Sequence, residues 1–332
     1  MTSYELDVVA VGNALVDVLA NIDESFVNNE KQNGMVKGAM TLIDEERARA
    51  LYAKMPPSLE VSGGSAANTM AGFASFGGNG GFIGKVAKDQ LGEVFTHDLK
   101  NQGLVFKTPA LDNGPATGRC LILVTPDAQR TMNTYLGASI EMSEDDIDEK
   151  LISQAAITYL EGYLFDRDQA KKAFEKAGEI AHKSGNDLAL TLSDVFCVER
   201  HREDFQRLVD GSVDILFANE QEIMALYETD NFMEACQKAA AKCRITAVTR
   251  GEKGSLVISG EEKVEIKAMP PEKLVDTTGA GDLYAAGFLY GLSRNKSHFE
   301  CGRLGTLAAT EVISHMGPRP QTSLQDLASQ AV

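Results

Sequence analysis

The chain has 332 residues, of which 43% are apolar, and a formal net charge of −16 at pH 7. This length suits one large α/β domain with an accessory part, and the apolar content supports a sizeable core. The acidic balance argues against nucleic acid or an anionic membrane as a partner, because both bind clustered Lys and Arg. Phosphate ligands remain open, since backbone N–H groups and a bound cation can hold them without net positive charge.

Cysteine usage and the N-terminal segment favour a cytoplasmic protein. No C-x-x-C pair occurs among the cysteines, which is typical of free thiols in a reducing compartment. They are Cys120, Cys197, Cys236, Cys243 and Cys301. The first twenty residues contain acids and lack the basic segment of a signal peptide. No stretch approaches the ~20 uncharged apolar residues of a membrane helix.

The first half of the chain is predicted to contain strands and helices in turn. LDVVAVG (6–12) is an apolar, β-branched run that ends in glycine, as buried strands do. Helical periodicity is present at 41–55, which stops at two prolines, and at 89–103, which ends in Gly103. Between these helices, 78–86 is expected to be a glycine-led strand.

The second half alternates more regularly. Strands are predicted at 156–164, 187–194 and the start of 213–227, with helices at 167–185, about 199–210, the end of 213–227 and 231–243. A strand pair at 245–259 is followed by a turn, a helix at 281–294 and a last helix at about 297–316. This alternation indicates a mostly parallel sheet with helices on both faces.

Two stretches, 14–40 and 104–137, are richer in strand-like residues and turn signals. We interpret them as a small β lid; a surface flap without function is the alternative. The rest, 1–13, 41–103 and 138–332, is then the large α/β domain that binds nucleotide and substrate.

The turn at 275–292, VDTTGAGDLYAAGFLYGL, carries the main functional signal. Gly279, Ala280 and Gly281 are expected at the start of a helix, where N–H groups lack intrahelical partners and the helix dipole is positive. Glycines let the backbone fold closely around a ligand, so this stretch can form an anion hole. Asp282 would repel a bound phosphate, but it is well placed to take the proton of a hydroxyl that attacks the phosphate. A plain turn with a capping acid is the alternative.

DTTGAGD followed by an apolar helix resembles the second signature of the PfkB (ribokinase-like) carbohydrate kinase family. The resemblance implies a ribokinase-like three-layer fold, ATP and Mg²⁺ as ligands, and Asp282 as the catalytic base. It implies that Gly279, Ala280 and Gly281 bind the transferred phosphoryl group. It also implies a monovalent cation, with K⁺ as the candidate, near Asp276 and Thr278.

Two further motifs match the family's substrate side. GGSAANT (63–69) resembles its G-G-x-x-x-N pattern, which implies that Gly63, Gly64 and Asn68 contact sugar hydroxyls. GNALVD (12–17) implies that Asp17, with Asn13 close by, accepts hydrogen bonds from paired hydroxyls. Strand–helix punctuation and a polar turn are the respective alternatives.

Two others match its nucleotide side. NEQE (219–222) could simply be a capping box. The resemblance to N-x-x-E implies that Asn219 and Glu222 support phosphate and a magnesium water network. VTRGEKGS (248–255) places Thr249 and Gly251 as ATP contacts. Arg130 either clamps phosphate when the lid closes or is a solvated surface arginine.

The resemblance runs from GNALVD to GPRP (317–320) and favours the adenosine kinase branch, since GGSAAN replaces the G-G-K-G-A-N of ribokinases. The expected reaction is ATP-dependent phosphorylation of the 5′-hydroxyl of a ribonucleoside, adenosine above all. Ala14 and Thr278 depart from that branch, so a ribokinase- or fructokinase-like sugar kinase stays open, as does a non-catalytic sugar or nucleoside binder. The expected partner is a small molecule, and the chain is expected to be a monomer or a homodimer formed through the lid.

Overall fold

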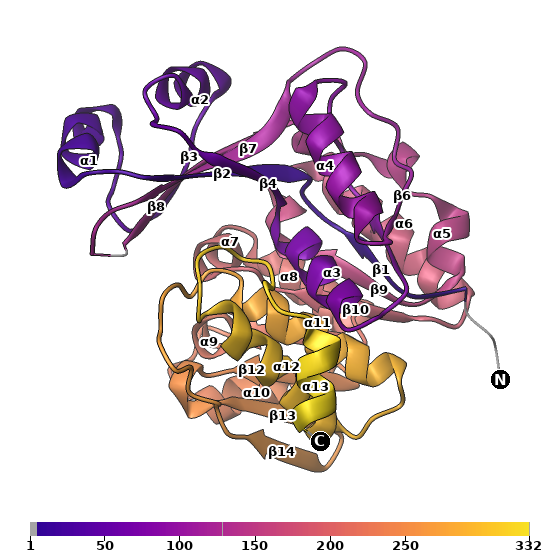
Figure 1. The fold of residues 1–332 in the computed structure, drawn as a ribbon. Helices are drawn as coiled ribbons and strands as arrows, with labels where there is room; N and C mark the ends of the chain where they lie inside the picture. The colour runs from indigo at the N-terminus through magenta and orange to yellow at the C-terminus, as the bar shows by residue number, and fades with distance from the viewer. Residues whose placement is uncertain (1–4, 128, 332) are drawn as a thin grey trace.

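The computed structural model describes residues 5–127 and 129–331 and contains two sheets (Figure 1). The large sheet has seven parallel strands in the order β6 (Val105–Phe106), β5 (Gly80–Ile83), β1 (Leu6–Val11), β9 (Ala155–Glu161), β10 (Asp187–Thr191), β11 (Ile215–Asn219) and β12 (Ile245–Thr249). Two antiparallel strands complete one edge: β13 (Ser255–Ser259) and β14 (Glu262–Ile266).

The sequence of β1 shows why this sheet is buried on both faces. Val8 and Ala10 join one hydrophobic cluster, while Leu6, Val9 and Val11 join the other. Successive side chains of a strand point to opposite faces, so a continuous apolar run fits a sheet that is covered on each side.

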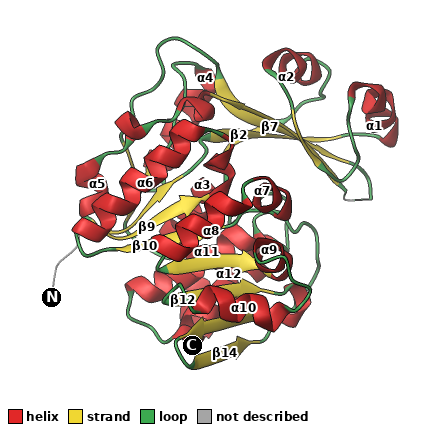
Figure 2. Ribbon diagram, turned by 180° about the vertical axis from the view of Figure 1, so that it is seen from behind, coloured by secondary structure: helices red, strands yellow, loops and turns green. Residues whose placement is uncertain are grey.

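Helices pack on both faces of the large sheet (Figures 1 and 2). One cluster includes buried residues of α3 (Ser65–Ser75), α4 (Gln90–Asn101), α11 (Ala280–Ser293) and α12 (His298–Val312). The other includes buried residues of α5 (Glu149–Ser153), α6 (Asp168–Lys183), α7 (Val195–Arg200), α8 (Arg202–Gly211), α9 (Glu220–Leu226) and α10 (Phe232–Ala240). The three layers confirm the predicted α/β fold.

The second sheet, which we call the small sheet, has the order β3 (Met40–Leu42), β8 (Arg130–Gly137), β7 (Thr117–Val124), β2 (Leu15–Asn21) and β4 (Leu59–Gly63). It extends away from the large sheet, with α1 (Glu24–Glu30) and α2 (Glu45–Tyr52) beside it (Figure 1). Short 3₁₀ turns complete the described part of the chain: Lys31–Asn33, Ala138–Glu141, Glu144–Asp146, Gly162–Asp166 and Gly251–Lys253.

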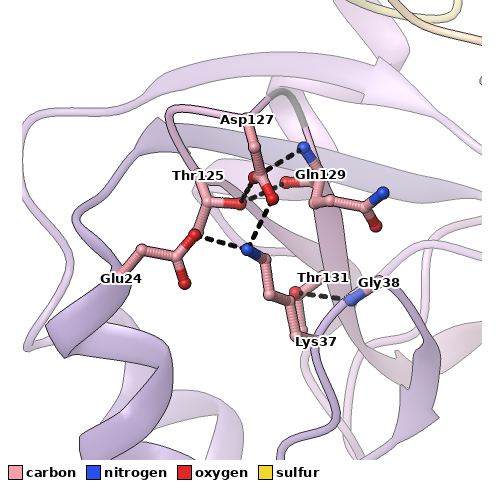
Figure 3. Close-up of polar contacts among 7 residues, drawn as sticks. All are labelled: Glu24, Lys37, Gly38, Thr125, Asp127, Gln129 and Thr131. Atoms are coloured by element: carbon pink, nitrogen blue, oxygen red, sulfur yellow. Dashed lines mark hydrogen bonds and ion pairs between the residues drawn. The ribbon is translucent and has the colours of Figure 1, made fainter.

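Polar contacts fix the turn between β7 and β8 at the outer end of the small sheet (Figure 3). The Asp127 carboxylate accepts hydrogen bonds from Thr125 Oγ1 at 2.6 Å and from the Gln129 N–H at 3.3 Å. Lys37 Nζ, from the segment before β3, lies 2.7 Å from Asp127 Oδ2 and also pairs with Glu24. These contacts tie the turn to α1 and so define where β8 begins.

Some elements differ from the expectation. The predicted helix at 199–210 is two helices, α7 and α8, and the segment 14–40 includes α1. A further helix, α13 (Leu324–Ala331), follows the predicted last one; its Leu324 is buried against the main core. No helix in the described part of the chain has the length and apolar character to cross a bilayer.

Strand pairing also cuts across the expected division of the chain. β4 comes from the segment assigned to the large domain, yet it pairs with β2 in the small sheet. β6 comes from the segment assigned to the lid, yet it pairs with β5 in the large sheet. Both strands are short, and their own sequences do not reveal their partners. The division into two domains therefore stays a prediction.

Candidate active site

A cavity of about 620 Å³ lies where the parallel strands end, beneath the small sheet. Its walls include residues at or just beyond the carboxyl ends of five strands: Asn13, Glu161, Thr191, Asn219 and Thr249. Open α/β sheets bind ligands at this edge, because loops and helix N-termini converge there.

The small sheet contributes a mainly apolar wall to this cavity. Met40, Leu42, Ile122, Met132 and Leu136 line it. Asp17 and Thr134 are polar residues of this sheet, whereas most other polar side chains in the described lining come from the ends of the large-sheet strands and from the starts of α3 and α11. A ligand with one apolar, flat part and one polar, hydroxyl-bearing part would suit this division.

The start of α11 has the backbone expected of an anion hole. Gly279 is the N-cap and has a left-handed φ of 78°, and a Cβ there would lie 2.8 Å from the backbone oxygen of Pro318. A Cβ on Gly281 would meet no atom within 4 Å. Gly279, Ala280 and Gly281 all line the cavity at the start of the helix, where N–H groups lack intrahelical partners. The Ala280 N–H donates to the Thr277 carbonyl oxygen at 3.3 Å.

Asp282 lies in the first turn of α11 and lines the same cavity. Its Oδ1 accepts a hydrogen bond from Ser65 Oγ at 2.6 Å, and its Oδ2 accepts one from Asn68 Nδ2 at 3.2 Å. Removal from water raises the pKa of Asp282 to about 6, although both hydrogen bonds oppose this rise. The carboxylate is thus mostly ionised at neutral pH and can still bind a proton.

Glu161, at the end of β9, is a buried acid that the sequence analysis missed. It accepts hydrogen bonds from Asn13 Nδ2 at 2.7 Å and from the N–H groups of Asn13 and Ala66 at 3.3 and 2.8 Å. Burial raises its pKa to about 7. Its signal in the sequence was an acid at the end of an otherwise apolar strand.

Asp17 also lies on the cavity wall, because alternate residues of β2 face it while Val16 and Val18 face the core. Burial raises the pKa of Asp17 to about 7, and the charges of Arg319 and Arg130 oppose this rise. Gly63 does not line the cavity; it makes room for Asp17, since a Cβ on Gly63 would lie 2.3 Å from the carboxyl carbon.

Gly64 joins β4 to α3, and Asn68 lies near the start of α3. A Cβ on Gly64, whose φ is 95°, would lie 2.2 Å from the carbonyl oxygen of Asn13. Asn68 Oδ1 accepts a hydrogen bond from Arg319 Nε at 3.3 Å, so its Nδ2 is left to donate to Asp282. Arg319 is a second residue that the sequence analysis missed, and GPRP was its only signal.

On the nucleotide side, Asn219 and Glu222 form the capping box of α9. The Asn219 N–H donates to Glu222 Oε2 at 2.9 Å, and the Glu222 N–H donates to Asn219 Oδ1 at 2.8 Å. The capping interpretation is therefore confirmed, and both residues also line the cavity. Burial raises the pKa of Glu222 to about 7, with Asp194 and Asp282 adding to the rise.

The structure places three of the remaining predicted residues, Gly251, Arg130 and Asp276, outside the cavity wall. Thr249 and Thr278 line it, whereas Gly251 and Arg130 do not. Arg130 is not a solvated surface arginine, because its side chain is 8% exposed and pairs with Asp276. Asp276 is likewise buried and outside the wall.

Magnesium fits the acids on this wall. Within residues 5–127 and 129–331, no group of three or more His, Cys, Asp or Glu side chains is arranged to hold a metal ion directly. Mg²⁺ usually keeps several waters and binds one or two carboxylates plus substrate phosphates, so a preformed cage is not required. Burial raises the pKa of Glu222 and of Asp282, and a cation bound nearby would lower both pKa values by stabilising the ionised carboxylates.

Known proteins resemble this chain along nearly its whole length. Residues 55–324 match the pfkB family carbohydrate kinase. The structure of an adenosine kinase from Sinorhizobium meliloti is 51% identical, with a TM-score of 0.92, over 99% of this chain and 100% of that one. A "probable sugar kinase protein" from Rhizobium etli is 47% identical, with a TM-score of 0.93, over 99% of each. Adenosine kinase from Saccharomyces cerevisiae is 27% identical over 93% of this chain and 95% of its own.

Proposed function

The chain belongs to the pfkB family of carbohydrate kinases, and we propose that it transfers the γ-phosphoryl group of ATP to the 5′-hydroxyl of a ribonucleoside, with adenosine preferred. The observation that carries this proposal is the position of Asp282. It lies in the first turn of α11, beside N–H groups that have no intrahelical partner, in a cavity lined by polar strand ends.

The acceptor would be held through its ribose. Asp17 can accept hydrogen bonds from two neighbouring hydroxyls, and charge-assisted bonds of this kind are short and strong. Asn68 lines the same cavity and donates to Asp282, with its amide orientation fixed by Arg319. Asn13 and Gly64 would complete the hydroxyl contacts, as predicted.

In the transfer step, Asp282 would accept the proton of the attacking 5′-hydroxyl. The N–H groups of Gly279, Ala280 and Gly281 would stabilise negative charge on the moving phosphoryl group. Glu222 and Asn219 would hold the waters of Mg²⁺, which supplies charge neutralisation between the phosphates. Thr249 would contact the nucleotide. The small sheet would shield the reacting groups from water, which otherwise competes as the acceptor.

The apolar wall of the small sheet supports a nucleoside over a free sugar. Met40, Ile122 and Met132 offer a surface that suits a planar base and would have no partner if the acceptor were ribose alone. The similarity to an adenosine kinase points the same way. A sugar kinase is the second candidate, because a protein described as a probable sugar kinase is nearly as similar.

A coupled assay of ADP release tests the proposal directly. Adenosine, inosine, guanosine, ribose and fructose are compared as acceptors at equal ATP and Mg²⁺. We expect adenosine to give the highest kcat/KM, by about tenfold or more over ribose, because burying a base adds binding energy that ribose lacks. A preference for ribose or fructose would refute the nucleoside assignment and leave the kinase assignment intact.

A further inference from the structure

A buried ion pair joins the small sheet to the turn in front of α11. Arg130 is the first residue of β8, and its Nη2 pairs with Oδ2 of Asp276. The two side chains are 8% and 3% exposed. Nε and Nη1 of Arg130 have no hydrogen-bond partner among the residues that the structure describes. Asp276 therefore compensates a guanidinium charge that water does not reach.

The direction of the Arg130 side chain follows from the strand. Arg130, Met132 and Thr134 alternate along β8, so they share one face of the small sheet. Met132 and Thr134 line the cavity, which places Arg130 on the face that looks toward the large sheet. The turn held by Asp127 and Lys37 fixes the start of β8 just before Arg130 (Figure 3).

The acceptor positions of Asp276 are largely used. Oδ1 accepts the N–H of Thr278 at 3.0 Å, and Oδ2 accepts the N–H of Gly317 at 3.1 Å in addition to pairing with Arg130. A carboxylate offers about four acceptor positions, so little remains for a metal ion. A monovalent cation at Asp276 would also be repelled by the adjacent guanidinium. Asp276, one of the two predicted cation ligands, therefore does not fit a dissociable ion.

Asp276 nevertheless governs the shape of the anion hole. Its bonds hold the turn at 276–278 against the loop at Gly317, and the next residue, Pro318, packs on Gly279. The charge beside Asp276 thus influences where the first N–H groups of α11 point.

We propose that Arg130 is the built-in cation of this turn. It is a positioning residue, brought by the small sheet, that takes the place of a monovalent ion at Asp276. Two consequences follow, and the kinetic one rests on the proposed function. The enzyme does not need K⁺, and the anion hole is fully ordered only when β8 is docked on the turn.

The test compares the wild type with Arg130→Ala and Arg130→Lys in KCl, NaCl and tetramethylammonium chloride, each at about 0.1 M ionic strength. The readouts are kcat and KM for adenosine, and the unfolding midpoint without substrates. For the wild type we expect the same kcat, within about twofold, in all three salts. Arg130→Lys retains the positive charge, so its kcat should likewise be the same in all three salts.

Arg130→Ala should lose kcat by about tenfold or more in tetramethylammonium chloride, with KM changed less, because the anion hole acts on the transition state. KCl should restore part of the loss and raise the unfolding midpoint of this variant but not of the wild type. These K⁺ responses would not arise if Arg130 only packed the interface.

Three results would overturn the proposal: activation of the wild type by K⁺ several-fold over tetramethylammonium, a K⁺-specific rise in its unfolding midpoint, or an Arg130→Ala enzyme with unchanged kcat. The first two need no variant and apply even if Arg130→Ala does not fold. A wild type that phosphorylates no nucleoside in any salt would refute the proposed function instead, and the unfolding comparison would still test the cation.

Discussion

Replacing Asp282 by Asn removes the proposed base and preserves the shape of its surroundings. The amide is nearly isosteric and retains one oxygen to accept a hydrogen bond from Ser65 or Asn68, whose atoms lie 2.6 and 3.2 Å from the carboxylate. It cannot take up a proton. General base catalysis contributes about 10²- to 10⁴-fold, so we expect kcat to fall by that factor, or by about 3 to 5 kcal/mol of barrier.

The pH dependence of kcat/KM in the wild type gives a second expected magnitude. The pKa of Asp282 is raised to about 6 by removal from water. At pH 5 about a tenth of the carboxylate is ionised, so kcat/KM of the wild type should be about a tenth of its plateau value and should approach the plateau by about pH 7. Binding of nucleotide and nucleoside changes the pKa of Asp282. The pH profile of kcat, which reports the bound enzyme, will therefore be displaced from the pH profile of kcat/KM, which reports the free enzyme.

The assay is ADP release from pH 5 to 8, with calorimetry of adenosine binding as the control for the fold of the site. Asp282→Asn should bind adenosine with an affinity within about tenfold of the wild type. Asp326→Asn removes the same charge from an exposed position on α13 and should keep wild-type rates. An Asp282→Asn enzyme with wild-type turnover and an unchanged acid limb would refute the assignment of the base.

Three further outcomes are expected. Asp17→Asn should raise KM for adenosine by about tenfold or more and lower kcat less, which initial-rate kinetics would reveal; an equal loss in kcat alone would contradict a ribose contact. Gly279→Ala forces a Cβ to 2.8 Å from Pro318 O at a φ of 78°, so calorimetric unfolding should show a loss of about 1–2 kcal/mol or more, whereas Gly211→Ala, whose Cβ would meet nothing, should not. Burial raises the pKa of Glu161 from 4.5 to about 7; its stabilising contribution is full below about pH 4.5 and is lost as pH rises through about 7. The ligand-free protein should therefore unfold at lower urea at pH 8 than at pH 5, and the reverse order would refute this sign.

The sequence predicted the composition of the cavity wall well where a residue follows a strand. Asn219 and Thr249 end their strands and Asn13 follows another, and parallel strands bring their carboxyl ends to one edge. The glycine-rich start of α11 was likewise readable, since its role depends on local backbone. The comparisons confirm the predicted family and, with it, a kinase rather than a non-catalytic binder.

Residues whose contacts lie far away in the sequence could not be predicted from local patterns. Glu161 meets Asn13 and Ala66 across 148 and 95 positions, and Arg319 meets Asn68 across 251. Nothing in the local pattern of a strand or a proline-rich loop specifies such a partner. The ion pair of Arg130 was missed for the same reason, because its position on the face of β8 becomes meaningful only when the sheet is docked.

The chain segments that join the small sheet to the rest of the molecule carry glycine where they pass closest to neighbouring backbone. β2 and β4 leave side by side, with Leu15 opposite Gly63, and the next residue, Gly64, fits under the Asn13 carbonyl. On the other side, Gly118 and Gly137 approach so closely that a Cβ on either would collide with backbone oxygen. β4 also runs directly into the helix that bears Ser65 and Asn68. In the proposed mechanism, an outward movement of the small sheet would displace Ser65 and Asn68, the hydrogen-bond partners of the proposed base Asp282, and would so couple substrate entry to the position of that carboxylate.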